Sequence, residues 1–218
     1  MANVSALAAP GGPEGACSAG DGHAGTSTAK EDSTNSRSPA QLPPLAFSAV
    51  SQQSYVVTED GALLTTTAEP RDRPALCSDQ VMSSGQSCVE VTVVRNGHSL
   101  IVGVGRPTLD PNMTDVDRSP DFWGVHSQGY LCHDDSTDGY LCAGVGVLLR
   151  YQYRTGDVLH LLLDSDTGTL TLKKNGTLIG PVVASGLTGD LCWVVACWAT
   201  PSAAPTSVRI KTLDPTQF

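Results

Sequence analysis

The sequence contains few aromatic residues, no cluster of basic residues and no long hydrophobic run. Phe, Trp and Tyr make up 5% of the 218 residues, and the formal net charge is −9. Because the 13 basic side chains form no block, nucleic acid and anionic membranes are poor candidates as partners. No apolar run approaches the roughly 18 residues that a membrane-spanning helix needs. We therefore expect a monomer that binds neither nucleic acid nor membrane.

The sequence also lacks a secretory signal and any CxxC pair. The N-terminal MANVSALAAPGG has neither a basic segment nor a long apolar core. Without paired ligand spacing, the cysteines are a weak zinc signal, and we interpret them as small buried hydrophobic residues in a reducing compartment. We expect an intracellular protein, cytoplasmic or nuclear. The cysteines are Cys17, Cys77, Cys88, Cys132, Cys142, Cys192 and Cys197.

Large apolar residues are nearly absent from positions 1–42, which consist mainly of Ala, Gly, Ser, Thr and Pro. Such a segment buries too little apolar surface to offset the entropy of ordering it. We therefore predict a disordered tail over residues 1–42 and a folded domain over residues 43–218. Three roles are open for this predicted tail: a plain flexible segment, a linker, or a phosphorylation target at Ser36 and Ser38.

Short apolar runs separated by turn residues fill the rest of the chain. Residues 155–180 predict three strands joined by two turns, and Asn175-Gly176 is typical of a type I′ hairpin turn, which needs a positive φ at both positions. No window shows a sustained period of 3.6, so the pattern favours an all-β sandwich or barrel. Further strands are expected at 54–58, 62–66, 89–93, 100–104, 191–199 and 208–211.

Seven short motifs occur in a fixed order along the domain. They are SGQSCVEV (84–91), VGV (102–104), FWG (122–124), GDV (156–158), LD with GTL (163–170), NG followed by Gly180, and VRI (208–210). This series resembles the SPRY domain family over residues 47–213. The resemblance implies a concanavalin-like β-sandwich of two antiparallel sheets with long loops at one edge. It also implies a role in binding a short peptide or a partner protein, with no chemistry of its own.

Three segments resemble the SPRY branch whose members carry a C-terminal SOCS box: IVGVGRPTLDP (101–111), WAT (198–200) and Arg73-Pro74. The 218 residues contain no SOCS box, so we do not expect recruitment of a ubiquitin ligase through one. A role as a substrate-recruiting adaptor is compatible with the resemblance. The partner-binding residues that it implies are Arg71, Arg73, Pro74, Ala75, Arg106, Pro107, Thr108, Trp198, Ala199 and Thr200.

Those residues have structural interpretations as well. Arg and Trp are frequent anchors of protein interfaces, because Arg donates forked hydrogen bonds and Trp offers a large rigid surface. Trp198 could equally be a core residue at the end of a strand, and Arg73 a solvated loop charge. We assign Trp123 and Trp193 to the core because both lie beside apolar strand residues.

We expect that the protein binds no metal and no cofactor and is not an enzyme. Residues 164–168 (DSDTG) resemble the start of a calcium loop but lack its Gly and Glu spacing, so the aspartates are expected to bind the turn backbone. His133-Asp134-Asp135 is more typical of a solvated loop than of a metal site. The alternatives are a lectin-like carbohydrate-binding sandwich and, less favoured, a glycoside hydrolase, for which Glu90 is the one Glu in a well-defined central strand.

Overall fold

The computed structural model describes residues 44–67, 71–133, 149–198 and 202–218. The predicted disordered tail lies outside these residues, and so does the boundary at 42/43, so both stay predictions. No helix in the described residues is long and apolar enough to cross a membrane.

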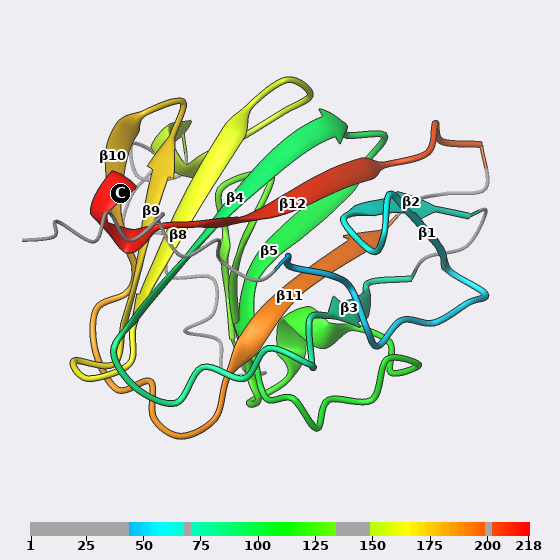
Figure 1. The fold of residues 1–218 in the computed structure, drawn as a ribbon. Helices are drawn as coiled ribbons and strands as arrows, with labels where there is room; N and C mark the ends of the chain where they lie inside the picture. The colour runs from blue at the N-terminus through cyan, green and yellow to red at the C-terminus, as the bar shows by residue number, and fades with distance from the viewer. Residues whose placement is uncertain (1–43, 68–70, 134–148, 199–201) are drawn as a thin grey trace, which may run out of the picture. The chain divides into compact units, whose positions relative to one another are not determined.

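In the residues that the structure describes, twelve strands form two antiparallel sheets, as the resemblance to SPRY domains implies (Figure 1). The seven-stranded sheet has the order β1-β2-β12-β4-β8-β9-β10, and the five-stranded sheet the order β3-β11-β5-β6-β7. The strands are β1 (Tyr55–Thr58), β2 (Leu63–Thr66), β3 (Arg73–Leu76), β4 (Gln86–Arg95), β5 (Ser99–Gly105), β6 (Phe122–His126), β7 (Leu131–Cys132), β8 (Val158–Asp164), β9 (Thr169–Lys174), β10 (Thr177–Val183), β11 (Cys192–Trp198) and β12 (Ser207–Leu213). Two short 3-10 helices, η1 (Val116–Arg118) and η3 (Pro215–Gln217), complete the described elements, together with a helical turn at residues 149–151.

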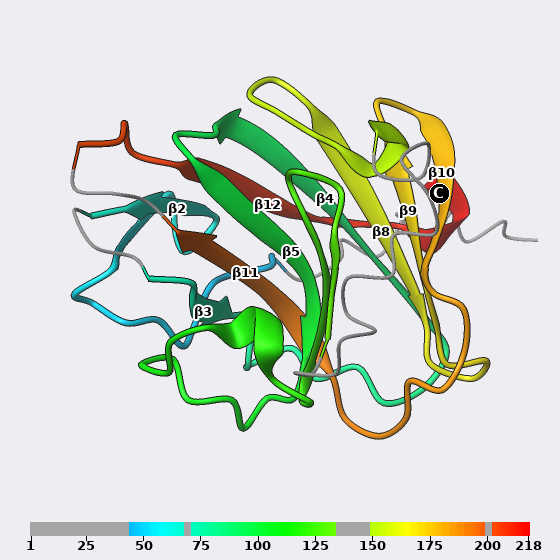
Figure 2. The same ribbon diagram turned by 180° about the vertical axis from the view of Figure 1, so that it is seen from behind.

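The main core lies between the two sheets. Alternate residues of each strand point into it, as the period of two along a strand requires. Val89, Val91 and Val93 of β4 lie in the same buried cluster as Val102 and Val104 of β5. Burial of side chains from both sheets in one cluster makes the domain a sandwich, and its two layers are visible in both views (Figures 1 and 2).

A second, smaller core covers the outer face of the five-stranded sheet. Leu109 and Val116, from the connection between β5 and β6, pack there against Ile101, Val194 and Ala196. Seen from behind, the helical turn η1 lies beside β3 (Figure 2). The connection therefore covers part of the outer face of the five-stranded sheet.

Two glycines let β5 and β6 approach closely on that outer face. Gly103 pairs with Gly124 across the two strands. A Cβ atom at Gly103 would lie 2.1 Å from the carbonyl oxygen of Trp123, which is much closer than any real contact. The strands can hold this spacing only because neither position carries a side chain.

The turn conformations and the burial of the cysteines in the described residues agree with the sequence predictions. Asn175 and Gly176 have φ values of 50° and 77°, and the Asp164 carboxylate accepts hydrogen bonds from the backbone of Asp166 and Thr167 at 3.1 and 2.9 Å. These bonds confirm that the aspartate at the head of this turn binds the backbone. All five cysteines in the described residues are free and buried, and Cys17 and Cys142 lie outside those residues.

Candidate functional site

Among the described residues, the predicted partner-binding arginines and Trp198 are divided between opposite ends of β11. Cys192 pairs with Gly105, so residues 106–108 lie near the first end, whereas Trp198 pairs with Ser99 at the other. Six residues of extended strand separate the two ends by about 20 Å. The structure therefore does not bring Arg106 and Trp198 together, and they cannot contact the same side chain of a partner.

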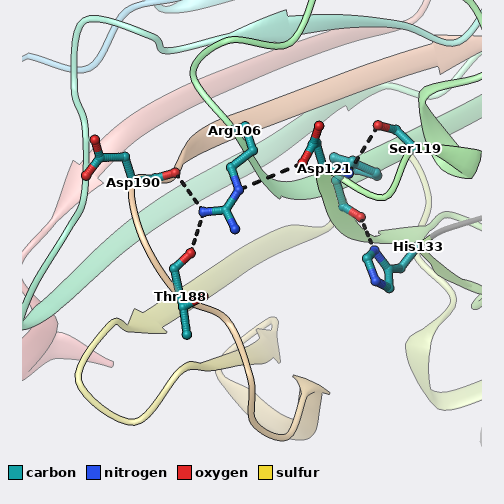
Figure 3. A network of polar contacts seen from close by, with 7 residues as sticks. Arg106, Ser119, Asp121, His133, Thr188 and Asp190 are labelled. Atoms are coloured by element: carbon teal, nitrogen blue, oxygen red, sulfur yellow. Dashed lines mark hydrogen bonds and ion pairs between the residues drawn. The ribbon is translucent and has the colours of Figure 1, made fainter.

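At the first end, the domain's own backbone surrounds the Arg106 guanidinium (Figure 3). Its Nη1 donates hydrogen bonds to the carbonyl oxygens of Thr188 and of Asp190, the latter at 3.2 Å. Its Nε lies 3.9 Å from Oδ1 of Asp121, and its carbon Cζ lies 5.4 Å from the centre of the Trp123 ring. Arg106 thus fastens the loop before β11 to the start of β6.

The groups around Arg106 are also paired within the chain. His133 Nδ1 lies 2.9 Å from the carbonyl oxygen of Phe122, and its ring stacks on Trp123 with centroids 4.8 Å apart. Asp134 and Asp135, which sequence reasoning weighed as metal ligands beside His133, lie outside the described residues. Thr108 is exposed and Pro107 partly so. At this end of β11, which we call the closed end, Arg106, Asp121 and His133 each contact another described residue.

The other end of β11 exposes a large aromatic side chain. Trp198 is 38% exposed, whereas Trp193, five residues earlier on the same strand, is 5% exposed. The prediction that Trp193 belongs to the core is confirmed, and Trp123 is partly buried against it. The ring of His98 meets Trp198 edge-on, with centroids 4.4 Å apart and planes at 77°. We call this the open end of β11.

Arg73 lies next to Trp198 in the sheet but points to the opposite face. It pairs with Cys197, whose side chain belongs to the core between the sheets. Its Nη1 donates to Ser54 Oγ at 3.0 Å, its Nε is buried without a hydrogen-bond partner in the described residues, and its carbonyl oxygen accepts from the Tyr55 hydroxyl at 2.5 Å. Because side chains alternate along a strand, Arg73 and Trp198 serve different surfaces.

The remaining residues of the predicted set differ in accessibility. Pro74 and Ala75 are buried within β3, with Ala75 at 0% exposure, so their side chains are not available to a partner. Arg71 is exposed in the turn before β3. Ala199 and Thr200 lie outside the described residues.

Asp72 is the residue at the open end that sequence reasoning missed. Its backbone N–H donates to the carbonyl oxygen of Cys197 at 2.8 Å, which places it directly beside Trp198. Carboxylate oxygens of Asp72, Asp115 and Asp117 all lie within 4.8 Å of one another. Burial, and then repulsion from Asp117 and Asp115, raises the pKa of Asp72 to about 7.

Two features make the Asp72 carboxylate unusual. Its Oδ1 is buried and has no hydrogen-bond partner among the residues that the structure describes. The residue also has a positive φ of 50°, as does Arg71 before it with 46°, so both lie in the left-handed region. More than 40 positions separate Asp72 from Asp115 in the sequence, and no local spacing signals their contact.

A serine and a histidine also meet near the open end, but their geometry is wrong for nucleophilic catalysis. Ser99 Oγ lies 2.6 Å from Nε2 of His126, whose Nδ1 accepts a hydrogen bond from the backbone of Gln128 at 3.0 Å. The neutral ring must then carry its proton on Nε2 and donate it to the serine, whereas a general base accepts the serine proton. Burial, with a contribution from His98, lowers the pKa of His126 to about 4.

Glu90 lies on the outer face of the seven-stranded sheet between basic side chains. Its cross-strand neighbours are Lys211 on β12 and His160 on β8. The carboxylate Oε2 lies 3.5 Å from Nε2 of His160. A glycoside hydrolase needs a second carboxylate facing the first across the substrate. In the described strands, neither cross-strand neighbour of Glu90 provides one.

No known family model matches the sequence, and no curated protein matches it. Solved structures match at the level of fold. The SPRY domain of human HERC1 is 22% identical, with a TM-score of 0.56, and the match covers 73% of this chain and 93% of that one. A human SPRY domain is 17% identical with a TM-score of 0.50, covering 72% and 94%. The PSpry domain of TRIM65 is 16% identical with a TM-score of 0.50, covering 76% and 87%. The domain therefore has the fold of SPRY domains.

Proposed function

We propose that the domain is a non-enzymatic interaction module that binds a short peptide or an extended segment of a partner protein at the open end of β11. Such a module would serve as a substrate-recruiting adaptor inside the cell. The SPRY fold supports this proposal, because the resemblance implies binding through edge loops. The fold alone carries no function, so the argument rests on the site.

One observation carries the proposal, namely the exposure of Trp198. Its indole lies at the end of a strand whose other residues are all buried, Trp193 included. Large aromatic side chains at a surface dominate binding energies when a partner covers them, because they bury much area and lose little conformational entropy. The ring of His98 contacts the indole edge-on. An exposed indole that already packs on one neighbouring ring is a suitable anchor point for a partner.

The proposal retains only some of the partner-binding residues that the sequence predicts. Arg71 and Trp198 are exposed at the open end and would contact the partner directly. Arg73 would act from the edge of the sandwich, where its guanidinium is bound to Ser54 on one side. Arg106 lies about 20 Å away along β11, and we assign it to the structure of the closed end.

The test is a selection of random peptides against the intact 218-residue chain, followed by affinity measurements on purified variants. We expect Trp198→Ala to weaken the selected peptides at least tenfold, since an interface anchor of this kind contributes roughly 2 kcal/mol or more. Leu178→Ala is the matched control, because Leu178 is also a large exposed apolar residue, on β10. Arg73→Ala reports whether the sandwich edge takes part.

Two results would overturn the proposal. In the first, no peptide is enriched over scrambled sequences. In the second, the enriched peptides bind Trp198→Ala as tightly as they bind the unaltered chain. Thermal unfolding of each variant shows whether a loss of binding reflects a loss of folding.

A further inference from the structure

The outer face of the five-stranded sheet is covered only in part by the described residues. The connection that contains Leu109 and Val116 buries Val194 and Ala196. Trp198 follows Ala196 on the same face of β11, because side chains alternate along the strand, yet it remains 38% exposed. The apolar surface of the sheet therefore continues past its cover and ends on an exposed indole.

Acidic groups line the boundary between the covered and the exposed part. The backbone N–H of Val116 donates to the carbonyl oxygen of Asp72 at 3.3 Å, and this bond fixes η1 against the start of β3. As a result the carboxylates of Asp115 and Asp117 approach that of Asp72. Asp115 is exposed, while Asp72 and Asp117 are partly buried. An exposed indole and a group of carboxylates thus lie on neighbouring residues.

Charged groups of both signs lie near Asp72, and they do not contribute equally to the shift of its pKa. Arg71 and Arg118 are exposed and adjacent in sequence to the acidic residues, while Arg73 points into the space between the sheets beside Ser54. The neighbouring titratable groups on β11 and β1 are Cys197 and Tyr55. The charges that shift the pKa of Asp72 are the two carboxylates, and both raise it. Both carboxylates disfavour the charged form of Asp72, and a cation brought near the group would favour it.

We propose that the open end recognises its partner through a lysine or arginine side chain, whose charge is held by Asp72 and Asp115 while its methylene stem lies on Trp198. This inference rests on the proposed function and names the chemistry of the partner. A cation in this position would relieve the repulsion among the carboxylates of Asp72, Asp115 and Asp117. Lysine and arginine stems pack well on aromatic surfaces while their charged groups reach a carboxylate.

The experiment repeats the random-peptide selection at pH 8 with three forms of the intact chain. They are the unaltered chain, Asp72→Asn and the control Asp60→Asn. Asparagine is tolerated in the left-handed region, so neither substitution strains the backbone. Asp60 is a matched position, since it also has a positive φ, of 52°, but lies in the turn between β1 and β2.

We expect peptides selected by the unaltered chain to be enriched in Lys or Arg at one fixed position. Replacing that residue by Met in a synthetic peptide should weaken binding at least tenfold, and Asp72→Asn should abolish the difference between the two peptides. The control Asp60→Asn should preserve it. Binding of the basic peptide should also weaken several-fold between pH 8 and pH 6, because the Asp72 carboxylate becomes protonated over that interval.

The inference fails separately from the proposed function. Two results would overturn the inference and leave the peptide-binding function in place. In the first, the selected peptides depend on Trp198 but are not enriched in Lys or Arg. In the second, Asp72→Asn still binds the basic peptide more tightly than its Met-substituted form, by the same factor as the unaltered chain. A selection that yields no binding peptide would overturn the proposed function, and the inference with it.

Discussion

The two ends of strand β11 contrast in how their polar groups are satisfied. At the closed end, Arg106 binds two backbone carbonyls and lies near the Asp121 carboxylate and the Trp123 ring. At the open end, Asp72 holds a buried oxygen without a partner in the described residues, beside an indole that is partly exposed. Both ends contain arginine, aspartate and tryptophan, so composition does not distinguish them.

The contrast shows how to separate a structural cluster from a candidate binding site. A charged group whose hydrogen bonds all end within the chain stabilises the fold, and a ligand would have to displace one of them. A carboxylate that is desolvated and repelled by its neighbours is destabilised in the free protein, and a ligand of opposite charge reduces that cost. By this criterion the open end is the better site, although resemblance alone named residues at both ends.

The largest change in the free energy of unfolding is expected from removing the contacts at the closed end. Arg106→Ala removes the hydrogen bonds to Thr188 and Asp190 and the contact with Trp123, and should lower the free energy of unfolding by about 2 kcal/mol. For a domain of this size the melting temperature would fall by roughly 4–8 °C. Peptide binding by the fraction that remains folded should not change. Calorimetry and titration of the same sample measure both, and weakened binding would show that the two ends are coupled.

A smaller effect of opposite sign is expected at the open end. Burial raises the pKa of Asp72 to about 7, above its value near 3.8 in an unfolded chain, so the charged carboxylate destabilises the fold above pH 7. Asp72→Asn should raise the free energy of unfolding at pH 8 by about 1 kcal/mol, after allowance for solvent screening.

This gain should depend on pH. As the pH falls below about 7, the folded chain takes up the proton and relieves the cost, so the advantage of the Asn variant should shrink by pH 5. Urea unfolding at the two pH values tests the sign. An Asn variant that is less stable at pH 8 would contradict the assignment of Asp72 as a strained carboxylate.

The smallest effect concerns His126, whose pKa is lowered to about 4 by burial and by His98. The unfolded chain binds a proton near pH 6.5 and the folded chain does not, so stability is complete above pH 6.5 and is lost as the pH falls toward 4. We expect a loss of roughly 0.5–1 kcal/mol, discounted for screening. This loss should be measured in the Asp72→Asn variant, because protonation of Asp72 otherwise raises the stability over the same pH range. An imidazole NMR titration with a midpoint near 6.5 would contradict the prediction.

The strands and turns could be predicted from the sequence because their signals are local. The alternation of Val89, Val91 and Val93 sets the buried face of β4, and Asn175-Gly176 requires one class of turn. The order of motifs then indicated the SPRY fold. These features depend on period and turn chemistry, which a single stretch of chain displays.

The arrangement of the site could not be predicted in the same way. The separation of Arg106 from Trp198 follows from the register of β5 against β11, and the opposite orientation of Arg73 follows from its pairing with Cys197. The approach of Asp72 to Asp115 depends on how η1 packs on the sheet. Each is a long-range contact, and motif order contains no information about which face a residue occupies.

The position of β11 within its sheet has a mechanical consequence. The strand is hydrogen-bonded to β5 along its whole length and to β3 at residues 194–197. Hydrogen bonds between antiparallel strands run across the strand direction. A partner that pulled on Trp198 along β11 would load these bonds together in shear, and they would not open one after another. A tether attached at this point would therefore resist force far better than one attached to an edge strand.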